Sequence, residues 1–223
     1  MELETLGLFI LTETLLSITP GPAVLLVLGL SVRYGFKIGF GATLGILSVN
    51  AVYFTLAALG VGAMILASAT LFTAIKWIGA AYLVYLGVMM LRPLFIRFWG
   101  KSDSKDEVIN VANASMAVAD DKKDFRGSFV RGFILQASNP KNIAFFVAIL
   151  PQFISPEGNV AGQLFILGIV SVLLELPILV VYGLASSKSA KLMKVHVVEW
   201  IEGMGGAILI AMGAMLAMYR RTP

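Results

Sequence analysis

Long apolar stretches alternate with short polar ones along the chain, and this pattern predicts six membrane-spanning helices. A helix of roughly 20 predominantly apolar residues is long enough to cross the hydrocarbon core of a bilayer. The stretches that meet this length are about 6–31, 38–66, 70–92, 128–150, 161–185 and 200–219. The expected fold class is therefore an all-α polytopic membrane protein, with the first stretch kept as a span rather than cleaved as a signal peptide.

Two of these stretches contain residues that interrupt a helix. The first carries Thr19-Pro20-Gly21-Pro22, and the fourth carries Ser138-Asn139-Pro140-Lys141-Asn142. A proline removes a main-chain donor and clashes with the preceding turn, so a helix breaks or bends there. In lipid such a break is tolerated only where protein or a water-lined cavity satisfies the freed groups. Interruptions at matching places in two halves of a chain are typical of a transporter's substrate site.

The second half of the chain resembles the first in the order and spacing of several short segments. The matching pairs are Leu44–Val49 with Leu167–Val172, 79–87 with 205–213, and Thr19-Pro20 with Asn139-Pro140. Because each half has three predicted spans, the two halves would enter the membrane in opposite directions. We therefore expect a 3+3 inverted repeat with broken first and fourth helices, an architecture linked to alternating access around a site at mid-membrane.

One long polar segment divides the chain. Residues 93–127 contain five aspartates among several lysines, and the segment is less hydrophobic than the predicted spans. Low hydrophobicity with mixed charge is typical of a disordered or loosely helical linker. The expected organisation is a first three-helix repeat over 1–92, a polar cytoplasmic linker over 93–127 and a second three-helix repeat over 128–223.

The composition agrees with a membrane protein and excludes several kinds of chemistry. The 223 residues are 58% hydrophobic and 13% charged, whereas soluble domains are roughly 45–50% apolar and 25% charged. The absence of cysteine removes disulfide exchange, thiolate metal sites and a cysteine nucleophile, and the single histidine, His196, lies in a polar connection. The chain has no phosphate-binding Gly-Lys-Ser/Thr loop and no Ser-His-Asp set. We expect no enzyme, no cofactor, no metal site and no ATP-driven transport within this chain.

The distribution of basic residues predicts the orientation. Twelve of the 17 Lys and Arg residues fall in the first, third and fifth connections, whereas the opposite face has Lys76, Arg220 and Arg221. Since cytoplasmic loops carry the excess of basic residues, both termini are expected outside. The net charge of +4 then reflects these loops rather than a nucleic acid or another anionic partner.

Two carboxylates within apolar stretches are candidates for function, because ionisable groups inside a membrane are costly. Glu175 lies in the middle of the run Phe165–Val181. Burial disfavours its charged form, so its charge would depend on proton occupancy, as proton coupling requires. The alternative is a structural pairing with Lys141. Glu13 precedes Thr19 by about 9 Å of helix; it either faces a cavity beneath the first break or reaches lipid headgroups at the outer interface.

Lys141 and two uncharged polar residues lie near the same expected depth. Lys141 binds a substrate carboxylate, neutralises Glu175 or extends along the broken helix, and the sequence leaves these alternatives open. Asn50 and Gln136 either line the site or only bridge helices. The main-chain donors from Thr19 to Ala23 begin a half-helix, whose positive end attracts a carboxylate or another anionic group.

An ordered set of motifs resembles the LysE/RhtB family of amino-acid exporters. The motifs are Thr19-Pro20-Gly21-Pro22, the glycines of Gly35–Gly45, Gly79-Ala80-Ala81-Tyr82-Leu83 with Leu86-Gly87, Asn139-Pro140-Lys141, Phe145-Phe146 and Leu150-Pro151-Gln152-Phe153. The resemblance covers nearly the whole chain except 93–127. It implies a multi-pass protein of the bacterial inner membrane that exports amino acids or close derivatives, driven by the proton gradient. Many relatives have an acidic residue after the second-span glycine, whereas Gly45 is followed by Ile46, which favours a neutral substrate. Glu175 matches a fifth-span glutamate of some relatives.

These observations favour a secondary transporter that exports neutral amino acids by proton antiport with alternating access. The expected substrate-binding residues are Thr19, Pro20, Gly21, Pro22, Asn50, Gln136, Asn139, Pro140 and Lys141, and the expected proton-coupling residues are Glu175 and Glu13. Its partners would be the amino acid, protons and the lipid bilayer, with a homo-oligomer left open. The alternatives are export of another small metabolite or a metal ion, and a non-transporting subunit of a membrane assembly. A membrane-embedded electron carrier would need cysteines.

Overall fold

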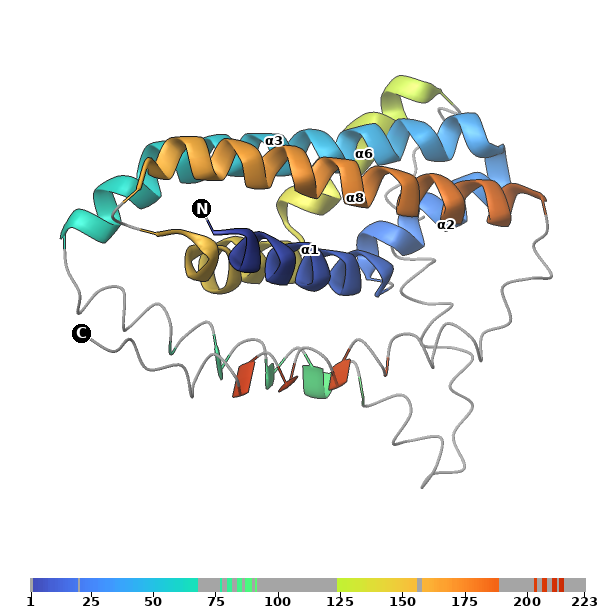
Figure 1. Ribbon diagram of the computed structural model, residues 1–223. Coiled ribbons are helices and arrows are strands. Elements are labelled where there is room, and N and C mark those ends of the chain that lie inside the picture. The colour runs from blue at the N-terminus through green and yellow to red at the C-terminus, as the bar shows by residue number, and fades with distance from the viewer. Residues whose placement is uncertain are drawn as a thin grey trace.

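The computed structural model describes residues 2–19, 21–67, 124–155 and 158–188, together with scattered helical positions at 77–91 and 203–214. The elements within these residues are all helical (Figure 1). They are α1 (Leu3–Ile18), α2 (Pro22–Tyr34), α3 (Phe36–Ala67), α6 (Phe125–Ala137), α7 (Pro140–Ala144), a π-helical turn (Phe145–Ile149), a 3-10 turn (Leu150–Phe153) and α8 (Val160–Lys188). The predicted third and sixth spans lie mostly outside the described residues, as does most of 93–127, so the division of the chain into two repeats stays a prediction.

The described helices include two to four candidate membrane spans. Phe36–Gly60 of α3 and Val160–Ser187 of α8 are long and apolar enough to cross a membrane singly. Two helix pairs, α1 with α2 and α6 with Pro140–Phe153, are each bent by 49° and raise the number of candidate spans to four if each pair is one span. The prediction of an all-helical membrane protein with two broken helices is confirmed. The helices extend a few residues beyond the predicted ends, because hydropathy does not register the polar turns at helix termini.

Both bends occur at the residues that precede the proline-containing half-helices. Thr19 ends α1 with an extended backbone (φ −67°, ψ 114°), and Gly21 is also extended before Pro22 begins α2. In the fourth span, Asn139 adopts nearly the same conformation (φ −70°, ψ 115°) before Pro140 begins α7. A residue before proline is pushed away from the helical region, and proline itself is well suited to the first helical position. Pro20 lies outside the described residues.

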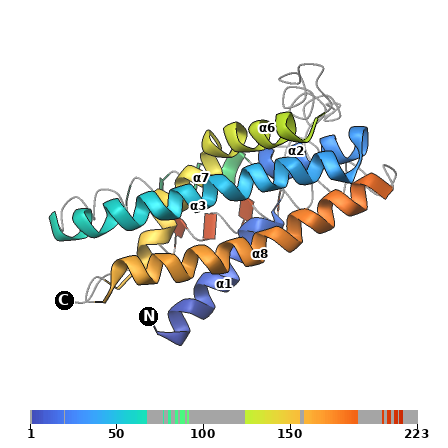
Figure 2. The same cartoon turned by 90° about the horizontal axis from the view of Figure 1, so that it is seen from above.

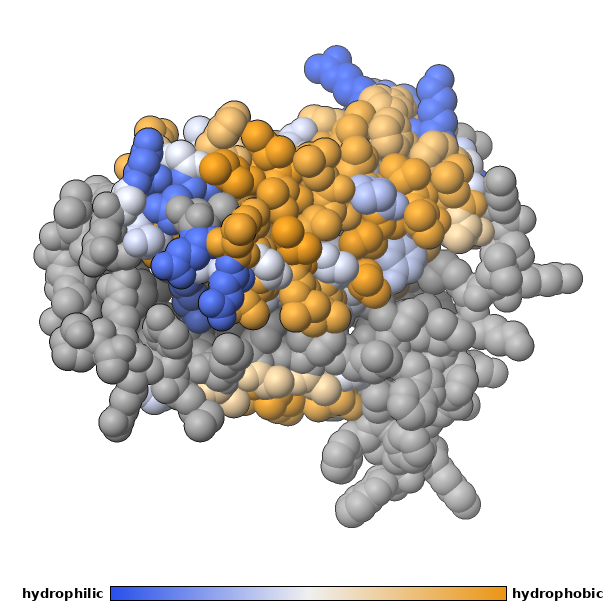
Figure 3. All heavy atoms as spheres, viewed as in Figure 1, coloured by the Kyte–Doolittle hydropathy of each residue, from blue (hydrophilic) through white to orange (hydrophobic). Residues whose placement is uncertain are grey.

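The long helix α3 lies between α6 and α8 (Figure 2), and α8 also contacts α1 and α2. Two groups of buried apolar residues result. One contains Phe9, Phe54, Phe145 and Leu164, and the other contains Val27, Leu30, Ile46 and Leu179. On the outer surface, apolar side chains cover much of the described face and hydrophilic ones gather toward the helix ends, as a bilayer requires (Figure 3).

Glycines allow α3 and α6 to cross with their backbones nearly in contact. A methyl group at Gly45 of α3 would collide with the main-chain oxygen of Phe129, and one at Gly132 of α6 would collide with that of Ala42. Small residues at helix crossings permit the close packing on which helix association in lipid depends. The same close approach recurs between Gly87 and the main chain of Gly206, which belong to the predicted third and sixth spans.

This packing predicts that Gly45→Val destabilises the protein. The added side chain meets main-chain atoms that have no room to move, so the free energy of unfolding should fall by about 2 kcal/mol or more. Gly60→Val in the same helix is the matched control, because a methyl group at Gly60 meets no atom within 4 Å in the described part of the chain. Thermal unfolding of the purified proteins in detergent compares them. Equal unfolding temperatures for the two variants would contradict the close crossing.

Candidate functional site

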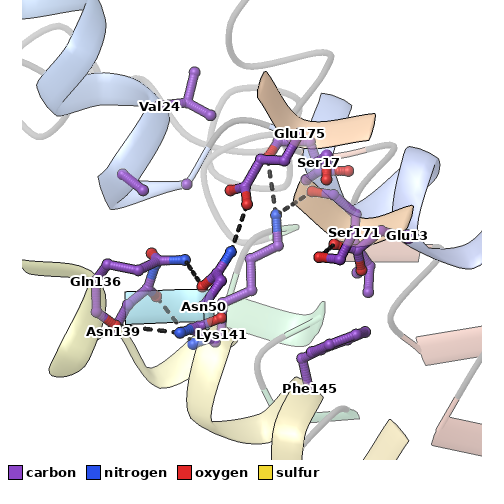
Figure 4. A pocket seen from close by; sticks show the side chains of 15 residues that line it. Glu13, Ser17, Val24, Asn50, Gln136, Asn139, Lys141, Phe145, Ser171 and Glu175 are labelled. Carbon is purple, nitrogen blue, oxygen red and sulfur yellow. Dashed lines mark hydrogen bonds between the residues drawn. The ribbon is translucent and has the colours of Figure 1, made fainter. Parts of the chain in front are cut away.

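A polar cavity of about 60 Å³ lies where the two broken helices meet. Its lining comes from α1, α2, α3, α6, α7 and α8, and it is bordered by Leu16 and Phe145 of one apolar cluster and Ala23 and Val24 of the other. Most of its lining side chains are nevertheless polar or charged (Figure 4). Polar groups inside a membrane protein are costly, so their concentration in one cavity indicates a functional site.

The cavity brings together most of the residues singled out in the sequence. Those that line it are Glu13, Thr19, Gly21, Asn50, Gln136, Asn139, Lys141 and Glu175. Pro22 and Pro140 begin α2 and α7 but do not line it, and Pro20 lies outside the described residues. The structure adds Leu16, Ser17, Ala23, Val24, Asn142, Phe145 and Ser171. Glu13 is buried, so it does not reach headgroups at the outer interface.

Side chains from other helices replace the donors that the first break removes. In a continuous helix the carbonyls of Leu16 and Ile18 would accept from residues 20 and 22, but both are prolines and have no N–H. The Lys141 ammonium donates to the Leu16 carbonyl and, at 2.9 Å, to that of Thr19. The Tyr182 hydroxyl donates to the Ile18 carbonyl at 2.7 Å. The missing main-chain bonds are thus replaced from α7 and α8.

The second break is completed in a similar way. Pro140 cannot donate to the carbonyl of Gln136, which accepts instead from the Asn139 N–H at 3.2 Å and from the Asn142 side-chain amide at 3.4 Å. The next carbonyl, that of Ala137, accepts from the Tyr53 hydroxyl of α3 at 2.6 Å. Each break therefore receives one tyrosine hydroxyl from a long unbroken helix, Tyr182 of α8 at the first and Tyr53 of α3 at the second.

A chain of side-chain amides connects the second break with Glu175. Asn139 donates to Gln136 at 3.1 Å, Gln136 donates to Asn50 at 3.0 Å, and Asn50 donates to the Glu175 carboxylate (Figure 4). All four residues are buried. Asn50 and Gln136 therefore bridge helices and line the cavity at the same time, so they do more than bridge helices. These hydrogen bonds hold the Glu175 carboxylate in place through Asn50 of α3 and Gln136 of α6.

Three ionisable side chains meet in this cavity. Glu13 accepts a hydrogen bond from the Ser171 hydroxyl at 2.6 Å, and both Glu13 and Glu175 are close enough to Lys141 to interact with it electrostatically. The ammonium itself donates to main-chain carbonyls rather than standing in a simple pair with Glu175. With both carboxylates ionised, the three groups carry one net negative charge inside the membrane.

The two half-helices differ at the ends that face the cavity. The Asn139 side chain caps α7 by accepting from the Lys141 N–H at 3.0 Å. The N-cap residue of α2 is Gly21, which has no side chain and so gives the described helix start no side-chain cap. The nearby Thr19 hydroxyl donates back to the Leu15 carbonyl at 2.7 Å. The first N–H groups of a helix and its dipole favour an anion. Ala23 and Val24, in the first turn of α2, line the cavity.

Aromatic rings close the cavity on the side of Phe145. This ring packs edge-on or tilted against those of Phe9, Phe54 and Phe146. Phe145 also begins the π-helical turn, and such turns often occur at functional sites. Within the described residues, no cluster of three or more His, Cys, Asp or Glu side chains could hold a metal ion.

Comparisons with known proteins agree with this architecture. A family model described as LysE type translocator matches residues 14–220. The uncharacterized membrane protein YrhP of Bacillus subtilis is 31% identical, over 95% of this chain and 97% of its own. A homoserine/homoserine lactone efflux protein of Salmonella typhimurium is 26% identical over 99% of both chains, and a leucine efflux protein of Klebsiella pneumoniae is 31% identical over 66% of this chain and 62% of its own. No solved structure matches significantly.

Because the Tyr182 and Tyr53 hydroxyls donate to carbonyls at the two breaks, we predict that both hydroxyls stabilise the protein. Tyr182→Phe and Tyr53→Phe each leave a carbonyl without its donor, so each should lower the free energy of unfolding by about 1 kcal/mol. Tyr34→Phe, at the end of α2 and away from both breaks, is the matched control. Thermal or denaturant unfolding in detergent measures the differences. Variants at 53 and 182 that unfold like the control would show that these hydroxyls do not support the breaks.

Proposed function

The chain belongs to the LysE type translocator family, a family of transporters rather than enzymes, and on that premise we propose that it exports a small neutral amino acid in exchange for protons. The observation that carries this proposal is the cavity at the two breaks, where two carboxylates, one ammonium and an uncapped helix start face one another. A zwitterion carries the two charges that such a set of groups complements. Among distant relatives, one is named for efflux of homoserine and its lactone and another for efflux of leucine.

The carboxylate of the amino acid would bind at the start of α2. There Ala23 and Val24 of the first turn line the cavity, and the positive end of the helix dipole favours an anion. Positive helix ends that point at an anionic substrate group are a recurring arrangement in transporters with broken helices. A Cβ at Gly21 would lie 3.6 Å from the Lys141 Cδ, an ordinary van der Waals contact, so Lys141 runs beside the start of α2.

The ammonium of the amino acid would bind on the carboxylate side of the cavity. Glu13 and Glu175 are the acidic groups there, held by Ser171 and Asn50 respectively. Homoserine lactone keeps the primary amine of homoserine but has no free carboxylate. In the relative named for both compounds, the amine is the group they share, and we propose that it is the main recognition element in this chain as well.

The proton would be carried by the same two carboxylates. One bound proton brings Glu13, Glu175 and Lys141 to overall neutrality, which favours moving the empty site across the membrane. Release of that proton restores a negative site that attracts the ammonium of a substrate. Proton and amino acid would therefore occupy the site alternately, as antiport requires.

The size of the cavity fits a closed stage of the cycle. A volume of about 60 Å³ holds roughly four water molecules, at about 15 Å³ each, and an amino acid requires it to widen. We propose that it widens through alternating access in a 3+3 inverted repeat of six spans in the bacterial inner membrane, with both termini outside. Export of another small zwitterionic metabolite is the alternative that the same groups would serve.

Glu175→Gln should abolish coupling. The amide keeps the size of the side chain but binds no proton in the relevant range, so substrate-dependent proton movement should fall at least tenfold. Proteoliposomes loaded with a panel of neutral amino acids, with and without a pH gradient, measure efflux and proton flux together. Glu4→Gln, an exposed position at the start of α1, is the matched control. Wild-type coupling in the Glu175 variant would remove this residue from the mechanism, and no proton flux with any amino acid would contradict the antiport.

The proposed orientation is testable because the chain has no cysteine. Glu4→Cys and Lys37→Cys place single thiols at opposite ends of the first broken span. A membrane-impermeant maleimide applied to intact spheroplasts should label position 4 and leave position 37 unlabelled until the membrane is permeabilised. The reverse pattern would invert the topology.

A further inference from the structure

Lys141 holds its ammonium in a set of acceptors that the first break creates. The carbonyls of Leu16 and Thr19 face it at the C-terminal end of α1. This is the negative end of the helix dipole, where a cation is favoured. Around it, Glu13 and Glu175 add two acidic groups that interact with the ammonium electrostatically. The arrangement is a cation site built from free main-chain oxygens and carboxylates.

The ammonium of Lys141 and the α-ammonium of an amino acid are the same functional group. Each is a primary ammonium with three donors and no acceptor. A substrate amine that enters the cavity would therefore donate to the same carbonyl and carboxylate oxygens that surround the Lys141 ammonium. The two ammonium groups carry like charge and need the same oxygens, so they compete for these acceptors.

We propose that the Lys141 ammonium occupies the binding site of the substrate's α-ammonium in the substrate-free protein. When an amino acid binds, Lys141 leaves this amine subsite to the substrate. This inference rests on the proposed function and specifies how its site selects a substrate. A new partner for Lys141 lies close by: its Nζ is 4.0 Å from the position that a Cβ at Gly21 would take, beside the uncapped start of α2. A short movement carries the ammonium from the Leu16 and Thr19 carbonyls to a carboxylate bound there.

The exchange of partners defines the substrate class. An amino acid supplies an ammonium for the carbonyls and a carboxylate for the displaced Lys141, so every charged group remains paired. A simple amine displaces Lys141 without giving it a new partner, and an N-acylated amino acid has no ammonium to replace it. The site therefore requires a primary ammonium and favours compounds in which a nearby carboxylate gives the displaced Lys141 a new partner.

The test uses methylammonium, a primary ammonium without a carboxylate, and purified full-length protein in detergent. Lys141→Met removes the tethered competitor and leaves the acceptors open. Methylammonium should then raise the unfolding temperature of this variant at concentrations at least tenfold lower than in the wild type. Lys37→Met, which removes an exposed lysine outside the cavity, should respond like the wild type. Tetramethylammonium, which has no donors, and Na⁺ at equal ionic strength should not stabilise Lys141→Met in this way.

A methylammonium response that is equal in Lys141→Met and the wild type would overturn the inference, as would equal stabilisation by Na⁺ or tetramethylammonium. Lys141→Gln, which keeps an uncharged donor, is the second variant, and it should show an intermediate response. If neither variant can be recovered folded, even when extracted in methylammonium, the Lys141 ammonium is required for folding and the inference fails. Because these measurements involve binding alone, they are independent of the efflux assays, whose failure would count against the proposed function instead.

Discussion

Main-chain carbonyls that lose their helical donors inside a membrane must find other donors, and the described structure is arranged around this requirement. Prolines at 20, 22 and 140 remove the N–H groups that would serve Leu16, Ile18 and Gln136. Lys141, Tyr182 and Asn142 supply replacements at these three carbonyls. Because Lys141 comes from one broken helix and serves the other, the two breaks are held together. The polar cavity between them follows from that contact.

Both breaks place an extended residue before a proline-containing half-helix, but they differ in how far the protein itself satisfies their polar groups. At the second break, Asn139 caps the new half-helix and begins a chain of amides that ends at Glu175, so its polar groups are largely satisfied within the protein. At the first break, the start of α2 has no such cap in the described structure, and the carbonyls of Leu16 and Thr19 accept from the Lys141 side chain of the other broken helix. In the proposed function, the second break is therefore mainly scaffold, and the first provides the groups that bind the substrate.

The sequence was sufficient for the broken spans and for most of the cavity lining, because proline within an apolar stretch and polar groups such as Glu175, Asn50 and Gln136 are costly in lipid and stand out. It could not indicate which group pairs with which. The carbonyl partners of Lys141 depend on where α7 lies relative to α1, so the sequence left open whether Lys141 neutralises Glu175, binds a substrate carboxylate or extends along the broken helix. Tyr53, Tyr182 and Ser171 gave no signal, since tyrosine and serine are common in membrane helices. The π-helical turn at Phe145–Ile149 likewise has no sequence pattern of its own.

The central claim is that one proton and one amino acid alternate in a site whose charge balance is set by Glu13, Glu175 and Lys141. The proton-to-substrate ratio tests it most directly, measured in proteoliposomes at zero membrane potential as the amino-acid gradient at which net flux reverses. For one proton per neutral amino acid, a gradient of about one pH unit should balance a roughly tenfold amino-acid gradient, since each corresponds to about 1.4 kcal/mol. A reversal point that does not move with pH would contradict the account.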